Sequence, residues 1–111
     1  MLTKDQHCLE SILEAIDRII EYTSGINTAD DFDKDYRNFD ATMMNFVVIG
    51  EFIDKISNEF KKKHPEIEWI KIKGFRNIVA HDYFGIDAEE VWQIIHTSLP
   101  KLQSDLETLI K

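Results

Sequence analysis

The residues best suited to chemistry are gathered in one short stretch, Arg76-Asn77-Ile78-Val79-Ala80-His81-Asp82-Tyr83. An arginine guanidinium is always charged and offers fork-shaped donors, so Arg76 could bind a scissile phosphate and stabilise the charge that develops on it. His81 titrates near neutrality and could take up or donate a proton. RNA carries its own nucleophile, the 2′-hydroxyl, which DNA lacks. The stretch therefore predicts an RNA-cleaving site that needs no metal.

Other polar side chains could assist this pair. Asn77 could hold a neighbouring group by a hydrogen bond, or simply brace the loop. Tyr83 could stack on a base or donate to a phosphate, or it could only pack. Glu51 could reach the same cleft, although a salt bridge to solvent-facing or interface groups fits it better. The alternatives without catalysis are that Arg76 forms a surface ion pair and that His81 stands at a helix end with no functional role.

The spacing of these residues limits how they can meet. On a continuing helix, Arg76 and Tyr83 would share a face, because seven residues make almost two turns. His81 would then lie about 140° around the axis from Arg76. The three side chains can converge only if the helix turns near Ala80, or if two subunits bring their clusters together. Either arrangement yields a polar cleft.

The net charge of −8 argues against broad, nonspecific binding of nucleic acids, which needs clustered Lys and Arg. The charge is unevenly spread, because residues 61–76 carry +4 and the rest of the chain −12. An acidic protein with one basic window that ends at the motif is typical of a localised phosphate site. The first three lysines could equally be the solvated end of a helix. The cations of the window are Lys61, Lys62, Lys63, Lys71, Lys73 and Arg76.

The remaining composition indicates a metal-free protein without a cofactor. Cys8 is the only cysteine, and no Cys/His cluster has the spacing of zinc ligands. The N-terminus lacks the apolar run of a secretory signal, and no apolar segment is long enough to cross a membrane. We therefore expect a cytoplasmic protein with no membrane contact, folded as one domain over residues 1–111.

Apolar periodicity and capping residues predict only helices. Thr28 and Asp30 could cap a short turn in the acidic connector 27–35, and Asp87 heads a capping box. Pro100 marks a kink or restart after Leu99. The expected fold is all-α, an up-down helical bundle of four to five helices. The expected long segments are residues 4–22, 36–63, 68–80, a fourth that opens at 87 and contains 91–99, and 102–110.

The second of these helices is apolar on two opposite sides, which must both be covered. In so small a chain one cover could be a second subunit, so a homodimer is expected, and Gly50 would allow another helix to approach closely. One stripe consists of Phe39, Met43, Phe46, Gly50 and Ile53, and the other of Ala41, Met44, Val48 and Phe52.

The motif resembles the Arg-x4-His-x-Tyr signature of the HepT-like toxins, a branch of the HEPN superfamily of helical ribonucleases. It departs in detail, because Val79-Ala80 is smaller than the Leu-Val often found before the histidine, and Phe84 follows Tyr83. The similarity covers nearly the whole chain, through residues 9–16, 45–51, 65–69 and 86–100.

The resemblance implies a metal-independent endoribonuclease of a toxin–antitoxin pair, with Arg76 and His81 in the catalytic positions. It implies a HEPN-like homodimer whose two motifs face a shared cleft. It also implies a partner, a small nucleotidyltransferase antitoxin that binds a nucleotide and adds AMP to the motif tyrosine (AMPylation), here Tyr83. Some relatives are noncatalytic partners of nucleotidyltransferases, so a binding module that cuts nothing is the second hypothesis.

Overall fold

The computed structural model describes residues 3–82 and 85–110, with only the backbone considered at residues 3, 78 and 80–82. This part of the chain contains helices and no strand, so the all-helical prediction is confirmed. No helix within it is long and apolar enough to cross a membrane. The helices are α1 (Thr3–Thr23), α2 (Ala29–Lys34), α3 (Tyr36–Lys55), α4 (Asn58–Lys63), α5 (Trp69–Asp82), α6 (Ala88–His96) and α7 (Ser98–Ile110).

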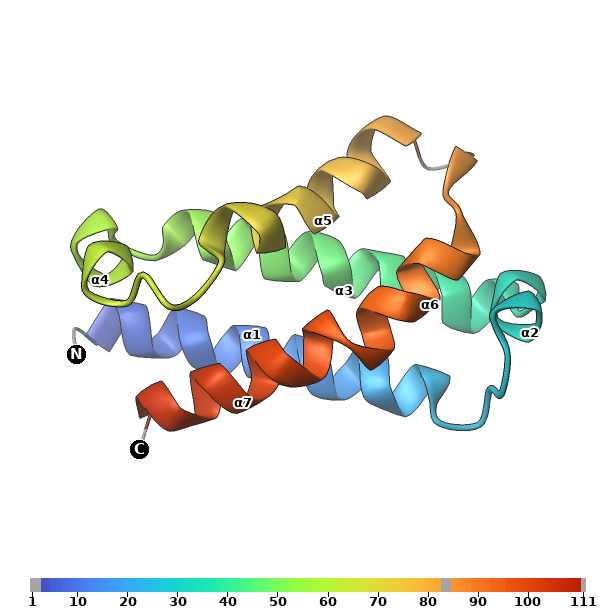
Figure 1. Ribbon diagram of the computed structural model, residues 1–111, viewed down its shortest axis with the longest axis horizontal. Helices are drawn as coiled ribbons and strands as arrows, with labels where there is room; N and C mark the ends of the chain where they lie inside the picture. The colour runs from blue at the N-terminus through green and yellow to red at the C-terminus, as the bar shows by residue number, and fades with distance from the viewer. Residues whose placement is uncertain (1–2, 83–84, 111) are drawn as a thin grey trace.

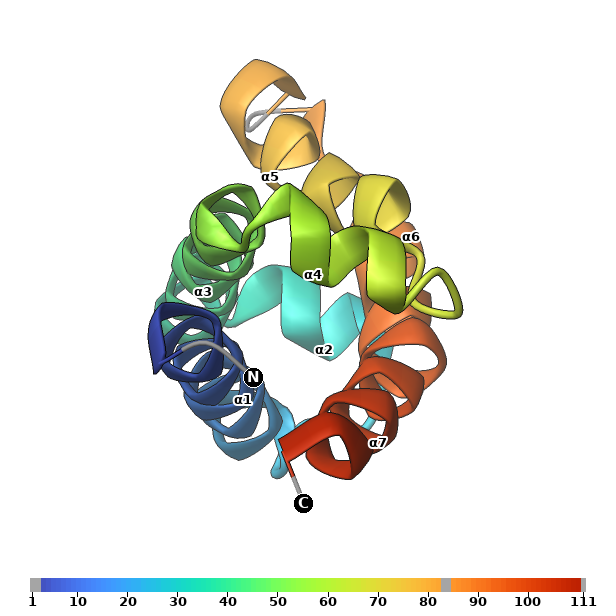
Figure 2. The same cartoon turned by 90° about the vertical axis from the view of Figure 1, so that its left-hand side faces the viewer.

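The long segments alternate in direction along the longest axis of the molecule (Figure 1). α3 packs between α1 and α5, and the chain then returns through α6 and α7, with α7 lying on α1. The short helices α2 and α4 close opposite ends of the bundle (Figure 1). The C-terminal part of α5 rises away from the other helices, which Figure 2 shows from the end of the bundle.

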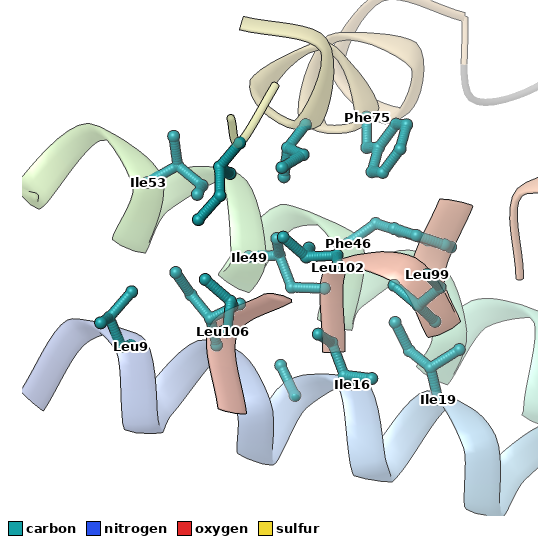
Figure 3. Close-up of a cluster of buried hydrophobic side chains, with 14 of the residues drawn as sticks. Leu9, Ile16, Ile19, Phe46, Ile49, Ile53, Phe75, Leu99, Leu102 and Leu106 are labelled. Atoms are coloured by element: carbon teal, nitrogen blue, oxygen red, sulfur yellow. The ribbon is translucent and has the colours of Figure 1, made fainter. Parts of the chain in front are cut away.

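The core lies where the apolar faces of α1, α3, α5 and α7 meet (Figure 3). The predicted stripe of α1 is confirmed at its centre, since Leu9, Ile12 and Ile16 are fully buried, while Ile20 remains 40% exposed. Burial of such side chains is the main force that holds so small a bundle together. The other helices contribute Phe46, Ile49, Ile53, Phe75, Leu99, Leu102 and Leu106.

The prediction of one continuous helix over residues 36–63 is wrong. α3 ends at Lys55, Ile56 is extended, and the Ser57 hydroxyl caps α4 by accepting from the Phe60 N–H at 3.1 Å. The cause lies in α1, because the buried Asp5 carboxylate accepts from the Ser57 N–H at 2.8 Å and from its hydroxyl at 2.7 Å. A contact with a residue so far back in the chain leaves no trace in local periodicity.

One boundary agrees with the predictions, because Thr28 caps α2 as expected. Other boundaries differ. α5 continues past Ala80 to Asp82. The last two helices separate at Thr97, before Leu99, and Pro100 falls in the first turn of α7, where its missing N–H is not needed. The predicted count of four to five helices is therefore too low, because the described residues form seven.

Candidate active site at the contact of α3 and α5

A close approach of two helices sets the position of Arg76. A Cβ atom added at Gly50 would lie 2.5 Å from the Arg76 Cβ, so α5 can lie this near to α3 only because Gly50 has no side chain. Phe46, one turn before Gly50, packs edge to face on Phe75, the residue before Arg76, at 5.5 Å between ring centroids. The predicted role of Gly50 is confirmed, and the approaching helix belongs to the same chain.

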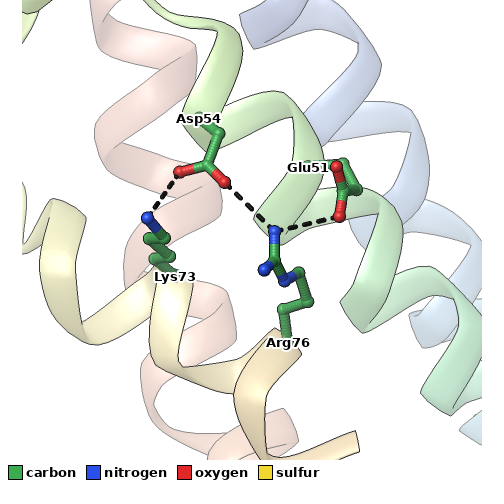
Figure 4. A network of polar contacts seen from close by, with 4 residues as sticks. All are labelled: Glu51, Asp54, Lys73 and Arg76. Atoms are coloured by element: carbon green, nitrogen blue, oxygen red, sulfur yellow. Dashed lines mark hydrogen bonds and ion pairs between the residues drawn. The ribbon is translucent and has the colours of Figure 1, made fainter. Parts of the chain in front are cut away.

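The Arg76 guanidinium is held by two carboxylates of α3 (Figure 4). Its Nη1 donates to Glu51 Oε1 at 3.0 Å and to Asp54 Oδ2 at 3.1 Å. The other oxygen of Asp54, Oδ1, lies 2.9 Å from the Lys73 Nζ. Two cations of α5 thus share one carboxylate of α3, and a second carboxylate completes a four-residue network (Figure 4).

The network lies at the protein surface, with side chains 30% exposed for Arg76, 33% for Asp54, 46% for Lys73 and 52% for Glu51. Water screens ion pairs of this kind, so they add little to the free energy of folding. The hydrogen bond from Lys73 holds the pKa of Asp54 below its ordinary value, and the nearby positive charges of Lys73 and Arg76 act in the same direction. The network therefore orders the guanidinium more than it stabilises the fold.

The other residues of the motif lie further along α5. Asn77 is exposed. The backbone of His81 is helical, its side chain is not described, and Tyr83 lies outside the described residues. Because α5 continues to Asp82, the helix does not turn near Ala80, and positions 76 and 81 remain about 140° apart around its axis. A single copy of α5 therefore does not bring the two positions to one face.

Most cations of the basic window are paired with carboxylates in the fold, which reduces the positive charge that the window presents to solvent. Lys63 pairs with Glu59 at 3.3 Å and Lys71 with Glu68 at 3.8 Å, and Lys73 and Arg76 pair with α3. Three of these carboxylates, Glu51, Asp54 and Glu59, come from outside the window. Within the described part of the chain, only Lys61 and Lys62 of the window are without an ion pair.

The sequence identified Arg76, suggested Glu51 and placed Lys73 among the cations of the basic window, but Asp54 and its pairing with Lys73 were missed. A signal was present, because Asp54 follows Glu51 by three residues and Lys73 precedes Arg76 by three. Residues three apart share a helix face, so two acids and two cations at equal spacing can face each other across a helix pair. Among the described residues, no group of three or more His, Cys, Asp and Glu side chains could hold a metal ion.

Comparisons with known proteins identify the family. The model of the family described as "Ribonuclease HepT-like" matches residues 12–109. The chain is 37% identical over 103 residues to "Probable ribonuclease HepT" of Thermococcus cleftensis, a match that covers 93% of each chain. It is 33% identical over 99 residues to "Putative RNase MJ1380" of Methanocaldococcus jannaschii, covering 89% of this chain and 90% of that protein. No solved structure matches the chain at a significant level. This protein belongs to the HepT-like ribonuclease family.

Proposed function

We propose that this protein is a metal-independent endoribonuclease in which Arg76 binds the scissile phosphate and His81 transfers protons. The observation that carries the proposal is the ordered guanidinium of Arg76, partly exposed and held by two carboxylates, in a chain of a ribonuclease family. Ordered donors that need not rearrange during the reaction stabilise developing charge efficiently. Asn77 and Tyr83 are auxiliary site residues in this proposal, and no metal or other cofactor takes part.

The reaction uses the 2′-hydroxyl of the RNA. The 2′-oxygen loses its proton to a base and attacks the adjacent phosphorus, while the bond to the 5′-oxygen breaks and that oxygen takes up a proton. The products are a 2′,3′-cyclic phosphate, which water can open to a 3′-phosphate, and a free 5′-hydroxyl. Arg76 neutralises the charge on the phosphoryl oxygens, and His81 supplies one of the two proton transfers.

We place the site in a cleft between two copies of the chain. Because positions 76 and 81 lie about 140° apart on one continuous helix, we propose that two α5 helices, one from each copy, pair to form the shared site. On the second apolar stripe of α3, Val48 and Phe52 are partly buried against the core of the same chain, whereas Met44 is 62% exposed. In this proposal the second subunit covers Met44.

We further propose the cellular setting that the family resemblance implies. The protein acts in the cytoplasm as the toxin of a toxin–antitoxin system. Its partner is a small nucleotidyltransferase antitoxin, which blocks the site by transferring AMP from a nucleotide to the Tyr83 hydroxyl. Mass spectrometry of the protein purified with and without the neighbouring nucleotidyltransferase checks this, and an unmodified Tyr83 in both samples contradicts it.

A second function is favoured by one observation. The protein has a net charge of −8, and four of the six cations in its basic window are paired with carboxylates. This charge distribution suits a noncatalytic helical subunit that presents a substrate to a nucleotidyltransferase. If either function is correct, a nucleotidyltransferase gene should lie nearby. Only if the protein is a ribonuclease should expression of this chain without its partner harm the cell.

The test is RNA cleavage by the purified, partner-free protein in EDTA, beside the His81→Ala variant. Cleavage by the native protein that is lost in His81→Ala is the expected result. His96→Ala serves as a control, because His96 is an exposed histidine on α6, and it should cleave normally. Cleavage that survives His81→Ala contradicts the proposal, and no cleavage by unmodified protein over many RNAs favours the noncatalytic function.

A further inference from the structure

Lys73 is the one member of the network that does not touch Arg76. It lies three residues before Arg76 on α5, and its Nζ contacts Asp54 Oδ1 while Arg76 contacts Oδ2 of the same carboxylate. Residues three apart lie on one face of a helix, so both cations reach α3 from the same side. The Asp54 carboxylate therefore bridges the two cations (Figure 4).

The bridge matters for the net charge around Arg76. Glu51 and Asp54 together carry two negative charges beside a single guanidinium, so without Lys73 the cluster would be net negative. A net negative surface repels an RNA phosphate before any hydrogen bond can form. With Lys73 in place the cluster is neutral, and the carboxylates can order Arg76 without excluding an anion.

We propose that Lys73 is a positioning residue of the ribonuclease site, which neutralises Asp54 and so allows the Arg76 guanidinium to take up an RNA phosphate. The inference rests on the proposed ribonuclease function and names a residue that the motif does not contain. It explains why a lysine stands one turn before the motif arginine on the same face. The lowered pKa of Asp54, caused first by its hydrogen bond from Lys73, agrees with a carboxylate that is kept charged and paired.

A direct contact between Lys73 and RNA would also make this lysine important, and a double-mutant cycle separates the two roles. If Lys73 acts through Asp54, Lys73→Gln weakens RNA binding only while the Asp54 charge is present. If Lys73 contacts RNA itself, the same substitution weakens binding equally in the Asp54→Asn background. Lys71→Gln is the matched control, because Lys71 lies two residues away on α5 and pairs with Glu68 instead.

The experiment measures KM and kcat for cleavage of one RNA oligonucleotide by the native protein, Lys73→Gln, Asp54→Asn, the double variant and Lys71→Gln. We expect Lys73→Gln to raise KM about three- to tenfold, the effect of one charge a few ångströms away in a screened setting, and to leave kcat nearly unchanged. Added salt should reduce the difference. In the Asp54→Asn background the same substitution should change KM by less than about twofold. Lys71→Gln removes a cation of the same basic window but leaves Asp54 paired, so it should raise KM less than Lys73→Gln does.

Equal increases of KM in both backgrounds would overturn the inference, as would no increase in Lys73→Gln or an equal increase in Lys71→Gln. In each of these cases the native protein still cleaves RNA, so the proposed function survives. Absence of cleavage by the unmodified native protein would instead overturn the proposed function, and this inference with it. Thermal unfolding of each variant confirms that the folded proteins are being compared.

Discussion

At the scale of single residues, the chemistry proposed for Arg76 depends on the two carboxylates of α3 that hold its guanidinium. Arg76 stands out because it belongs to a motif of residues with matching chemistry. Its partners Glu51 and Asp54 on α3 lie 25 and 22 residues earlier in the chain, and the sequence signal for them is the three-residue spacing that they share with Lys73 and Arg76. The alternative of a surface ion pair for Arg76 is present in the structure, and it orders the guanidinium that the proposed chemistry uses.

The shape of the arginine head group should matter as much as its charge. We expect Arg76→Lys to lower kcat about 100-fold, the typical loss when one donor to a developing charge is removed. A lysine keeps the charge but cannot donate in a fork to a phosphate while it also contacts α3. Rates of RNA cleavage in EDTA, with thermal unfolding as a check of folding, measure the effect. A variant that cleaves as fast as the native protein would show that only the charge is needed.

The pairing of Asp54 should appear in its titration. Because the pKa of this carboxyl is lowered in the folded protein, its contribution to stability is present above the ordinary pKa of 3.8 and is lost as the pH falls through the lowered value. Since the hydrogen bond from Lys73 is the main cause, Lys73→Gln should move the pKa of Asp54 upward. Carbon-detected NMR of the Asp54 carboxyl follows its titration in the native protein and in Lys73→Gln. Identical midpoints in the two proteins would contradict the pairing.

At the scale of elements, apolar spacing predicted which segments are helical but not all of their ends. The stripe of α1 and the close approach at Gly50 followed from the sequence. The end of α3 did not, because it depends on the buried Asp5 carboxylate of α1 binding Ser57. Tertiary hydrogen bonds of this kind override a periodic pattern that continues through the break.

The contact of α3 with α5 predicts opposite effects at two glycines. Gly50→Ala should destabilise the protein by about 1–3 kcal/mol, because the new methyl group must push α5 away, and cleavage should fall with the displaced Arg76. Gly74→Ala is the matched control on α5, where an added Cβ meets nothing within 4 Å. It should stabilise the helix by up to about 1 kcal/mol. Urea unfolding measures both, and similar effects at the two positions would argue against the close approach.

At the scale of the whole molecule, the sequence predicted an all-helical bundle whose long segments alternate in direction, and Figure 1 agrees. The number of helices was underestimated because α2 and α4 are only six residues long, and α4 was merged with its neighbour. Within one chain, positions 76 and 81 lie about 140° apart around α5, so a shared site for Arg76 and His81 depends on a second subunit. The shared site and the homodimer therefore stay predictions.

The second stripe of α3 provides the test of that dimer. Met44→Glu should convert the protein to a monomer and reduce cleavage, because it places a charge in the proposed apolar interface. Ser104→Glu is the control, since Ser104 is exposed on α7, a helix outside the proposed interface, and the added charge should leave the dimer intact. Light scattering after size exclusion gives the mass of each variant. A monomeric native protein, or a dimer in Met44→Glu, would contradict this interface.

The chemistry proposed for Arg76 and His81 is tested most directly by one measurement. A defined RNA oligonucleotide and the same oligonucleotide with a single 2′-deoxy residue at the cleaved position are incubated in EDTA with the native protein and with His81→Ala. We expect the native protein to cut only the all-RNA strand at this position, leaving a 2′,3′-cyclic phosphate, and His81→Ala to cut neither strand. Cleavage at the deoxy position, or undiminished cleavage by His81→Ala, would contradict this chemistry.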